Sequence, residues 1–113
     1  MGNYSPRQGD IIFLDCDPQA GHEQAGRRPA IVVSNHMFHR YVSSFAMVCP
    51  ITNTLRPFPL HVPLDARTKT TGVILCEQIK SLDFSARNVE FRETLPDDLL
   101  SDVLERIVLS LGF

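Results

Sequence analysis

The fold of this 113-residue chain is restricted most strongly by its short apolar runs. Each run is ended by prolines, glycines or clustered polar residues. Their β-branched residues favour strands, and the spacing of the breaks keeps these strands short. Eight prolines add to this limit, because proline is accepted in a sheet only at an edge, a bulge or a strand end. We expect strands within residues 10–15, 30–34, 44–52, 60–62, 72–78 and 87–92, and helical turns within 35–41 and 81–86.

An amphipathic helix is expected at residues 94–111. Its apolar residues recur at spacings of three and four, which places them on one face: Leu99, Leu100, Val103, Leu104, Ile107, Val108 and Leu111. Thr94 and Asp97 have the spacing of a capping box, and Gly112 provides a stop. Short strands with one helix predict a mainly β fold: a small, strongly bent antiparallel barrel with a C-terminal helix, one domain over residues 1–113.

The most distinctive polar segment is GHEQAGRRPAIVVS, at residues 21–34. It brings together an imidazole, a carboxylate, an amide and two guanidinium groups, from His22, Glu23, Gln24, Arg27 and Arg28. Pro29 favours extended backbone at Arg28, so this side chain should stand where the loop becomes a strand. Its guanidinium stays charged and offers paired donors to phosphate oxygens. The alternative is that Glu23 and Arg28 form only a surface ion pair.

Residues after the third expected strand add polar groups to this candidate site. The strand should deliver Thr52, Asn53 and Thr54 to a loop, where they either form turns or donate hydrogen bonds to phosphate. Arg56 and Phe58 place a cation beside an aromatic ring, which suits an unpaired nucleobase, although Phe58 in the core is the alternative.

Polar residues also end the strand expected at residues 72–78. Alternation would put Glu77 and Ile79 on one side and Gln78 and Lys80 on the other, so one polar pair should face the site or solvent. Further along, Arg87 offers either a phosphate contact or a salt bridge with Asp83.

Cysteine and histidine spacing gives no support for disulfides or metal. Cys16, Cys49 and Cys76 lie in or beside apolar runs, as expected for buried thiols in a reducing compartment. His36 and His39 are three residues apart, but no carboxylate or cysteine completes a recognisable ligand pattern, so no metal or other cofactor is expected. The chain shows no signal-peptide pattern and no apolar stretch of membrane-spanning length, which predicts a soluble, cytoplasmic protein.

Charge is segregated along the chain. The formal net charge is −2, but acidic residues dominate both ends of the sequence and basic residues dominate residues 18–92. A basic surface that binds nucleic acid is therefore compatible with the negative net charge of the whole chain.

In combination these motifs resemble the MazF/PemK/Kid toxins of bacterial toxin-antitoxin pairs, nearly from end to end. The resemblance is carried by GDIIFLDCDPQAGHEQAGRRPAIVVS from residue 9, CPIT from residue 49, TGVILCEQIKSLD from residue 71, and the closing helix. It implies an SH3-like barrel homodimer that cuts single-stranded RNA at a short sequence without metal. The substrate's own 2′-hydroxyl would attack, leaving a 2′,3′-cyclic phosphate and a 5′-hydroxyl, and a cognate antitoxin with an acidic disordered segment would occupy the same groove.

The resemblance also implies roles for individual residues. Arg28 matches the catalytic arginine, Thr52 the hydroxyl near the cleaved phosphate, and Glu23 the glutamate that orients the site. A Kid-like R-C-D-Q segment is replaced by Leu-Cys-Glu-Gln at residues 75–78, which favours a mechanism centred on Arg28. Whether Glu23 or His22 accepts the proton stays open. RNA contacts are expected from His22, Gln24, Arg27, Asn53, Arg56, Phe58, Glu77, Gln78, Lys80 and Arg87.

A rival hypothesis is a binding protein without catalysis. Gyrase-poisoning toxins resemble this fold but lack the loop motif, so the presence of Glu23 and Arg28 counts against that reading. A structural domain whose loop arginines are only surface charges is the third possibility.

Overall fold

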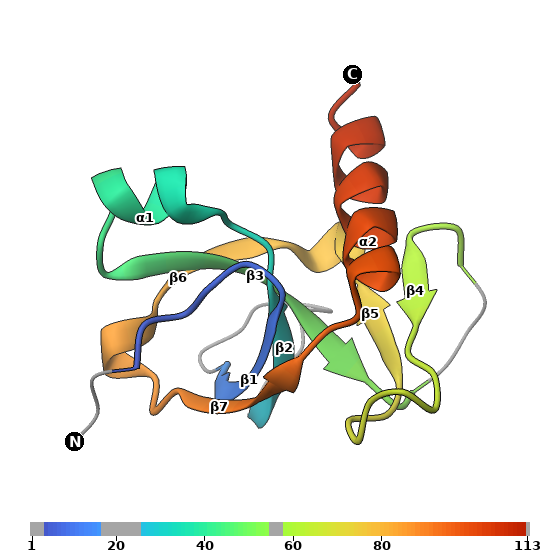
Figure 1. The fold of residues 1–113 in the computed structure, drawn as a ribbon, viewed down its shortest axis with the longest axis horizontal. Helices are drawn as coiled ribbons and strands as arrows, with labels where there is room; N and C mark the ends of the chain where they lie inside the picture. The colour runs from blue at the N-terminus through green and yellow to red at the C-terminus, as the bar shows by residue number, and fades with distance from the viewer. Residues whose placement is uncertain (1–3, 17–25, 55–57, 113) are drawn as a thin grey trace.

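The computed structural model describes residues 4–16, 26–54 and 58–112. Strands and short helical segments alternate along this part of the chain, and a long helix ends it (Figure 1). The elements are β1 (Asp10–Asp15), β2 (Arg27–Val32), α1 (His36–Tyr41), β3 (Phe45–Thr52), β4 (His61–Pro63), β5 (Val73–Leu75), the 3₁₀ turn η1 (Cys76–Gln78), β6 (Lys80–Asp83), the 3₁₀ turn η2 (Phe84–Ala86), β7 (Glu90–Thr94) and α2 (Asp97–Ser110).

The strands form one strongly bent antiparallel sheet. Its order is β4-β5-β3-β2-β1-β7, and β6 pairs with β3 beside this path. Within the described residues the sheet stays open between β4 and β7, so the bent antiparallel barrel that the sequence predicts is not closed. Strands β4 and β5, which end this order on one side, have three residues each. The predicted class, mainly β with a C-terminal helix, is confirmed.

Strand β3 holds two different partners along one side. Residues Phe45 to Val48 pair with β6, whereas Ile51 and Thr52 pair with β5. Pro50 lies in the gap between these two ladders and is matched with Ala30 of β2 on the other side. Proline has no N–H group to donate to a neighbouring strand. It is tolerated at position 50 of this central strand because Pro50 is paired with neither β6 nor β5.

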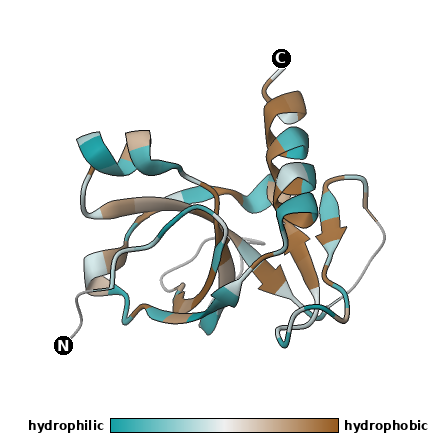
Figure 2. Ribbon diagram, viewed as in Figure 1, coloured by the Kyte–Doolittle hydropathy of each residue, from teal (hydrophilic) through white to brown (hydrophobic). Residues whose placement is uncertain are grey.

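Two apolar clusters lie on the two faces of the sheet. The cluster next to α2 contains Ile11, Ile31, Val33, Cys49, Ile51, Val62, Ile74, Cys76, Leu95 and Val103. The other contains Ile12, Leu14, Cys16, Ala30, Val32, Ala46, Val48 and Leu82. Consecutive residues of β1, β2 and β3 alternate between the clusters, as the pleat of a strand requires. Figure 2 shows hydrophobic colour on much of β3 and β5, and hydrophobic and hydrophilic residues alternating along α2.

The C-terminal helix is confirmed, but its expected capping box is wrong. Thr94 belongs to β7 and pairs with Asp10, so its side chain is not available as the helix cap. The capping position is Pro96, which makes no side-chain hydrogen bond to the helix. Asp97 and Asp98 do occupy the first turn, where negative charge is favoured by the helix dipole.

Other boundaries differ from the sequence-based expectation. Residues 76–78 leave the strand and form η1, so the strand alternation expected for Glu77 and Gln78 does not apply. The segment 81–86 is mostly β6 followed by η2, and the last strand begins only at Glu90. Asn88, which precedes that strand, has a φ of 52° and so makes a sharp turn.

Candidate functional site

The ends of three strands meet at one end of the sheet, which we call the loop end. Strand β1 stops there at Asp15, β2 begins at Arg27 and β3 stops at Thr52. The amide of Cys16 donates to the Gly26 carbonyl over 2.8 Å, which continues the β1–β2 pairing up to the connecting segment. Residues 17–25 and 55–57 lie outside the described residues, and with them the predicted site residues His22, Glu23, Gln24 and Arg56.

The strand register brings Arg28 and Thr52 together. Strands β2 and β3 pair with Ala30 opposite Pro50 and Val32 opposite Val48. Continuing this register by two residues aligns Arg28 with Thr52, and alternation puts both on the face that Ala30 and Val48 occupy. Arg28 is half-buried and Thr52 is only 7% exposed, so both side chains are held by the sheet.

Thr52 is fixed by two neighbours. Its Oγ1 accepts a hydrogen bond of 3.1 Å from the amide of Thr54, which leaves the hydroxyl proton for an external acceptor. Gly72, at a φ of 119°, packs against its backbone so closely that a Cβ there would overlap with the carbonyl oxygen and lie 2.8 Å from the carbonyl carbon. Glycine at position 72 therefore permits the approach that holds Thr52 at the loop end.

Asp15 ties three segments together at the loop end. Its carboxylate accepts from Asn88 Nδ2 over 2.8 Å and from Arg27 Nη1 over 3.3 Å. These contacts hold the pKa of the Asp15 carboxyl below its usual value, and the hydrogen bond from Asn88 has the largest effect. The backbone of Asp15 exchanges hydrogen bonds with Arg87, whose carbonyl accepts from the Asp15 amide and whose Nη1 donates to the Asp15 carbonyl. Arg87 is thus placed at the loop end.

A cationic surface lies on the other face of β1. The guanidinium carbons of Arg27 and Arg92 lie 5.3 and 4.2 Å from the centre of the Phe13 ring. Glu90 approaches both arginines, at 3.4 Å from Arg27 and 3.9 Å from Arg92. These pairs are exposed and long, so they neutralise the two guanidinium groups only weakly.

Phe58 and Glu77 both contact His61. The Phe58 ring is 49% exposed and its centre lies 5.0 Å from that of His61. His61 Nε2 lies 3.1 Å from Glu77 Oε2. The core alternative for Phe58 was therefore wrong, and two predicted RNA contacts share one surface. Gln78 ends η1 and Lys80 begins β6, where it pairs with Val48 of β3.

The cysteines are buried free thiols, as expected. Burial raises the pKa of the Cys76 thiol to about 11 and that of Cys49 further. Both are therefore protonated at neutral pH and unsuited to nucleophilic attack. Across residues 4–16, 26–54 and 58–112, no three His, Cys, Asp or Glu side chains are arranged to hold a metal ion, and no helix there is long and apolar enough to cross a bilayer.

Sequence reasoning missed three residues of the loop-end region: Phe13, Lys69 and Arg92. Phe13 looked like one more apolar residue of a strand, and the two cations were only part of the basic middle of the chain. The structure gathers all three around one cavity. The charge excess of residues 18–92 was the one available signal, and it does not single out these positions.

The chain matches the family described as the PemK-like, MazF-like toxins of type II toxin-antitoxin systems over residues 7–111. It belongs to this family. Endoribonuclease PemK of Escherichia coli is 36% identical over 104 residues, which cover 88% of this chain and 77% of that protein.

Solved structures agree with the family assignment. MazF from Deinococcus radiodurans superposes with a TM-score of 0.90 and 36% identity, covering 98% of this chain and 100% of that one. A MazE-MazF structure from the same organism gives a TM-score of 0.83 and 30% identity, covering 98% and 99%.

Proposed function

We propose that this protein is an endoribonuclease, the toxin of a type II toxin-antitoxin pair, which cuts single-stranded RNA at a short sequence without a metal ion. Its family and its likeness to Endoribonuclease PemK support the activity. The observation that carries the proposal is the register of β2 and β3, which, when continued by two residues, aligns Arg28 with Thr52 on one face of the loop end. A guanidinium and a hydroxyl at neighbouring strand positions provide the donors that a phosphodiester needs.

The nucleophile in the proposed reaction belongs to the RNA. A ribose 2′-oxygen attacks the adjacent phosphorus while the bond from phosphorus to the 5′-oxygen breaks, giving a 2′,3′-cyclic phosphate and a 5′-hydroxyl. Arg28 and Thr52 donate to the non-bridging oxygens and stabilise the charge of the phosphorane. DNA, which lacks the 2′-hydroxyl, is expected to bind without reacting.

Proton transfer is assigned to the segment between β1 and β2. The 2′-proton leaves to a base, for which Glu23 and His22 are the candidates, and the departing 5′-oxygen takes up a proton. Glu23 has an alternative role, which is to hold Arg28 in place. A pH–rate profile of Glu23→Gln and His22→Gln separates these roles, since only loss of the base removes the limb of the profile that the base produces.

Base recognition is proposed for the surface of Phe58, Glu77, Gln78 and Lys80, together with Arg56. The exposed Phe58 ring provides a stacking platform, and the carboxylate and amide of η1 provide hydrogen-bonding groups for base edges. Asn53, Gln24 and His22 contribute further polar contacts, and Arg27 and Arg87 add positive charge for the RNA backbone.

Regulation follows from the family. A cognate antitoxin with an acidic disordered segment is proposed to occupy the RNA groove, and the MazE-MazF structure supports such a partner. A homodimer in the cytoplasm, where messenger RNA is found, completes the proposal.

Cleavage of a long RNA in the presence of a chelator tests the function. The protein should cut at one short sequence, and the new 5′ ends should accept phosphate from a polynucleotide kinase without prior phosphatase treatment, because they carry hydroxyls. Arg28→Ala should lower the rate on the order of a hundredfold or more, with an unchanged circular dichroism spectrum. No cleavage of any RNA by the parent would favour a non-catalytic toxin that binds a protein such as DNA gyrase.

A further inference from the structure

A cavity of about 420 Å³ lies beside the candidate catalytic pair, on the opposite face of the strands. We call it the Phe13 pocket. Its lining residues are Phe13, Pro29, Asn53, Lys69, Thr70, Thr71, Arg92 and Glu93. Pro29 directly follows Arg28 within β2 and is paired with Phe13, so alternation directs it away from the catalytic face, and Asn53 follows Thr52 just beyond the end of β3. Its volume is in the range of pockets that bind small molecules and nucleotides.

The pocket presents positive charge despite the carboxylate in its wall. Glu93 accepts hydrogen bonds from the Thr70 amide and hydroxyl, both 2.8 Å, and from the Lys69 amide at 3.1 Å. Partial burial favours the neutral acid, but these hydrogen bonds outweigh it and keep the pKa of the Glu93 carboxyl below its usual value. The carboxylate therefore serves to fasten the turn before β5 onto β7, and that turn brings the Lys69 side chain to the pocket.

An aromatic ring forms part of the pocket wall. Arg92 lies over the Phe13 ring at 4.2 Å, and its nearest carboxylate, from Glu90, is 3.9 Å away. Asn53, exposed just after the end of β3, adds an amide group that can both donate and accept hydrogen bonds. The pocket thus combines two cations, a ring and an amide, which correspond to the phosphate, the face and the edge of a nucleotide.

We propose that the Phe13 pocket binds a nucleotide of the same RNA strand that flanks the cleaved bond. This inference rests on the proposed function. Lys69 and Arg92 contact its phosphate, and the base packs beside the stacked Arg92 and Phe13 side chains with its edge toward Asn53. The strand passes around the loop end from the face of Arg28 to the face of Pro29, across the guanidinium of Arg27. The RNA strand is then bound on both faces of the sheet while it is cleaved.

An acidic peptide is the competing occupant. It would use the two cations but gains little from the ring and the amide, and it does not account for the position next to Arg28 and Thr52. An RNA strand held at the catalytic pair continues on both sides of the cleaved bond, and the pocket adjoins that pair through Pro29 and Asn53.

Binding of uncleavable RNA tests the proposal. Oligonucleotides with a 2′-deoxy sugar at the cleavage position carry either the minimal site or extensions on its 5′ or 3′ side. Affinity is measured by fluorescence anisotropy at several salt concentrations for the parent, Lys69→Gln, Arg92→Gln and Phe13→Leu. Arg40→Gln is the control, because it removes one exposed positive charge from α1, away from the pocket.

Extension on one side should strengthen binding by the parent and by Arg40→Gln, and this gain should fall roughly tenfold in Phe13→Leu. In Lys69→Gln and Arg92→Gln the slope of log affinity against log salt should decrease by about 0.7 for each lost phosphate contact. Melting curves confirm that each variant is folded.

Three results would overturn the proposal. One is an extension gain in the three pocket variants equal to that of Arg40→Gln. Another is an equal loss for minimal and extended RNA, which would indicate a general charge effect. The third is unchanged RNA binding with weaker binding of an acidic peptide, which would assign the pocket to a protein partner. A parent that cuts no RNA refutes the proposed function instead, so the two failures are distinguishable.

Discussion

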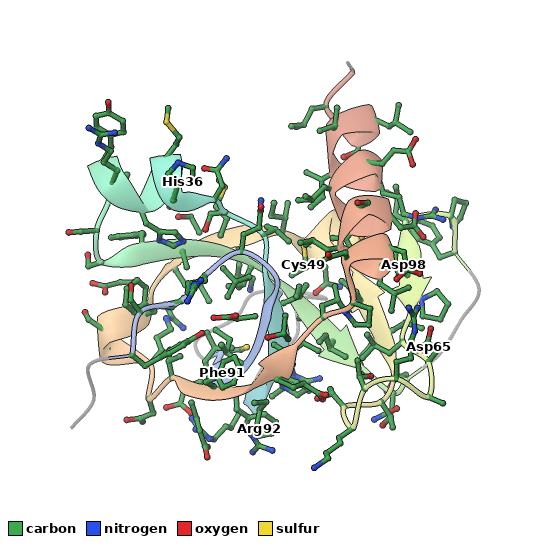
Figure 3. The ribbon with its side chains drawn as sticks, in the orientation of Figure 1. His36, Cys49, Asp65, Phe91, Arg92 and Asp98 are labelled. Atoms are coloured by element: carbon green, nitrogen blue, oxygen red, sulfur yellow. The ribbon has the colours of Figure 1, made fainter. Side chains whose placement is uncertain are left out.

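Arginines at the base of α2 and at the loop end have the same chemistry but different surroundings. Arg67 contacts two carboxylates, with Nη2 2.8 Å from Asp65 and Nη1 2.8 Å from Asp98. Arg92 stacks on Phe13 and has one carboxylate at 3.9 Å. In Figure 3 Asp65 and Asp98 lie near each other beside α2, whereas Arg92 is at the far edge of the sheet.

This difference distinguishes an arginine with a structural role from one that is proposed to bind RNA. A guanidinium bound by two carboxylates fastens the turn after β4 to the start of α2 and has little capacity left for a ligand. One that stacks on a ring keeps donors available to an incoming phosphate. Arginine count alone does not distinguish the two situations, but the carboxylates around each guanidinium do.

The largest expected effect is on the cleavage rate, when Arg28 and Arg67 are each replaced by lysine. Arg28→Lys keeps the charge but loses the paired donors, so the cleavage rate should fall on the order of a hundredfold. Arg67→Lys should leave the rate of the folded protein unchanged. Initial rates on one defined oligonucleotide make the comparison. Equal rates for parent and Arg28→Lys would show that the paired geometry is not used.

Gly72→Ala should displace Thr52, because position 72 packs against the backbone of Thr52. The new Cβ overlaps with the Thr52 carbonyl, and the φ of 119° is strained for alanine. We expect a loss of roughly 1–3 kcal/mol in the free energy of unfolding and slower cleavage, because Thr52 is displaced.

Gly112→Ala provides the matched control for this substitution. Gly112 also has a positive φ, of 90°, but nothing lies within 4 Å of its Cβ position. Urea denaturation and cleavage rates should show a loss of activity only for position 72. Equal activity in both variants would contradict the close approach of Gly72 to Thr52 as a determinant of the site.

Thermal unfolding should show the opposite ranking of the arginines. Arg67→Gln removes the ion pair with Asp98 that joins the turn after β4 to α2, and the ion pair with Asp65 within that turn, so its melting temperature should fall below that of Arg92→Gln. The effect should be modest, because the ion pairs are exposed and screened by salt. Differential scanning calorimetry at low and high salt measures it. A larger decrease for Arg92→Gln would reverse the assignment of structural and functional roles.

Acid should remove the contribution of Arg67 gradually. Its hydrogen bonds lower the pKa of the Asp65 and Asp98 carboxyls below their ordinary value of 3.8. The stabilisation is complete above that value and is lost as the pH falls through the lower folded-state values. Melting temperatures between about pH 5 and pH 2 should therefore fall less steeply for Arg67→Gln than for the parent. Parallel curves would mean that the two carboxyls are not coupled to folding.

Much of the fold followed from local pattern. Strand β1 was predicted at its observed bounds, and α2 followed from its apolar spacing. The errors lie where tertiary pairing decides the outcome. Thr94 looked like a helix cap but pairs with Asp10, and Glu77 looked like a strand residue but lies in a 3₁₀ turn beside His61.

The candidate site divides in the same way. Arg28 and Thr52 could be chosen from sequence because Pro29 and the strand ends restrict their positions. The Phe13 pocket could not, because it requires β1, the turn before β5 and β7 to meet. Those three segments are far apart in the chain, and no periodicity relates them.

The junction at Asp15 has a consequence for substitutions in the adjoining segment. The Cys16–Gly26 hydrogen bond and the contacts of Asp15 with Arg27, Arg87 and Asn88 secure both sides of the segment at residues 17–25. The framework therefore supports its own geometry up to that junction. Changes within residues 17–25, the segment proposed for proton transfer, are therefore expected to alter the cleavage chemistry while leaving the strand ends that carry Arg28 and Thr52 in place.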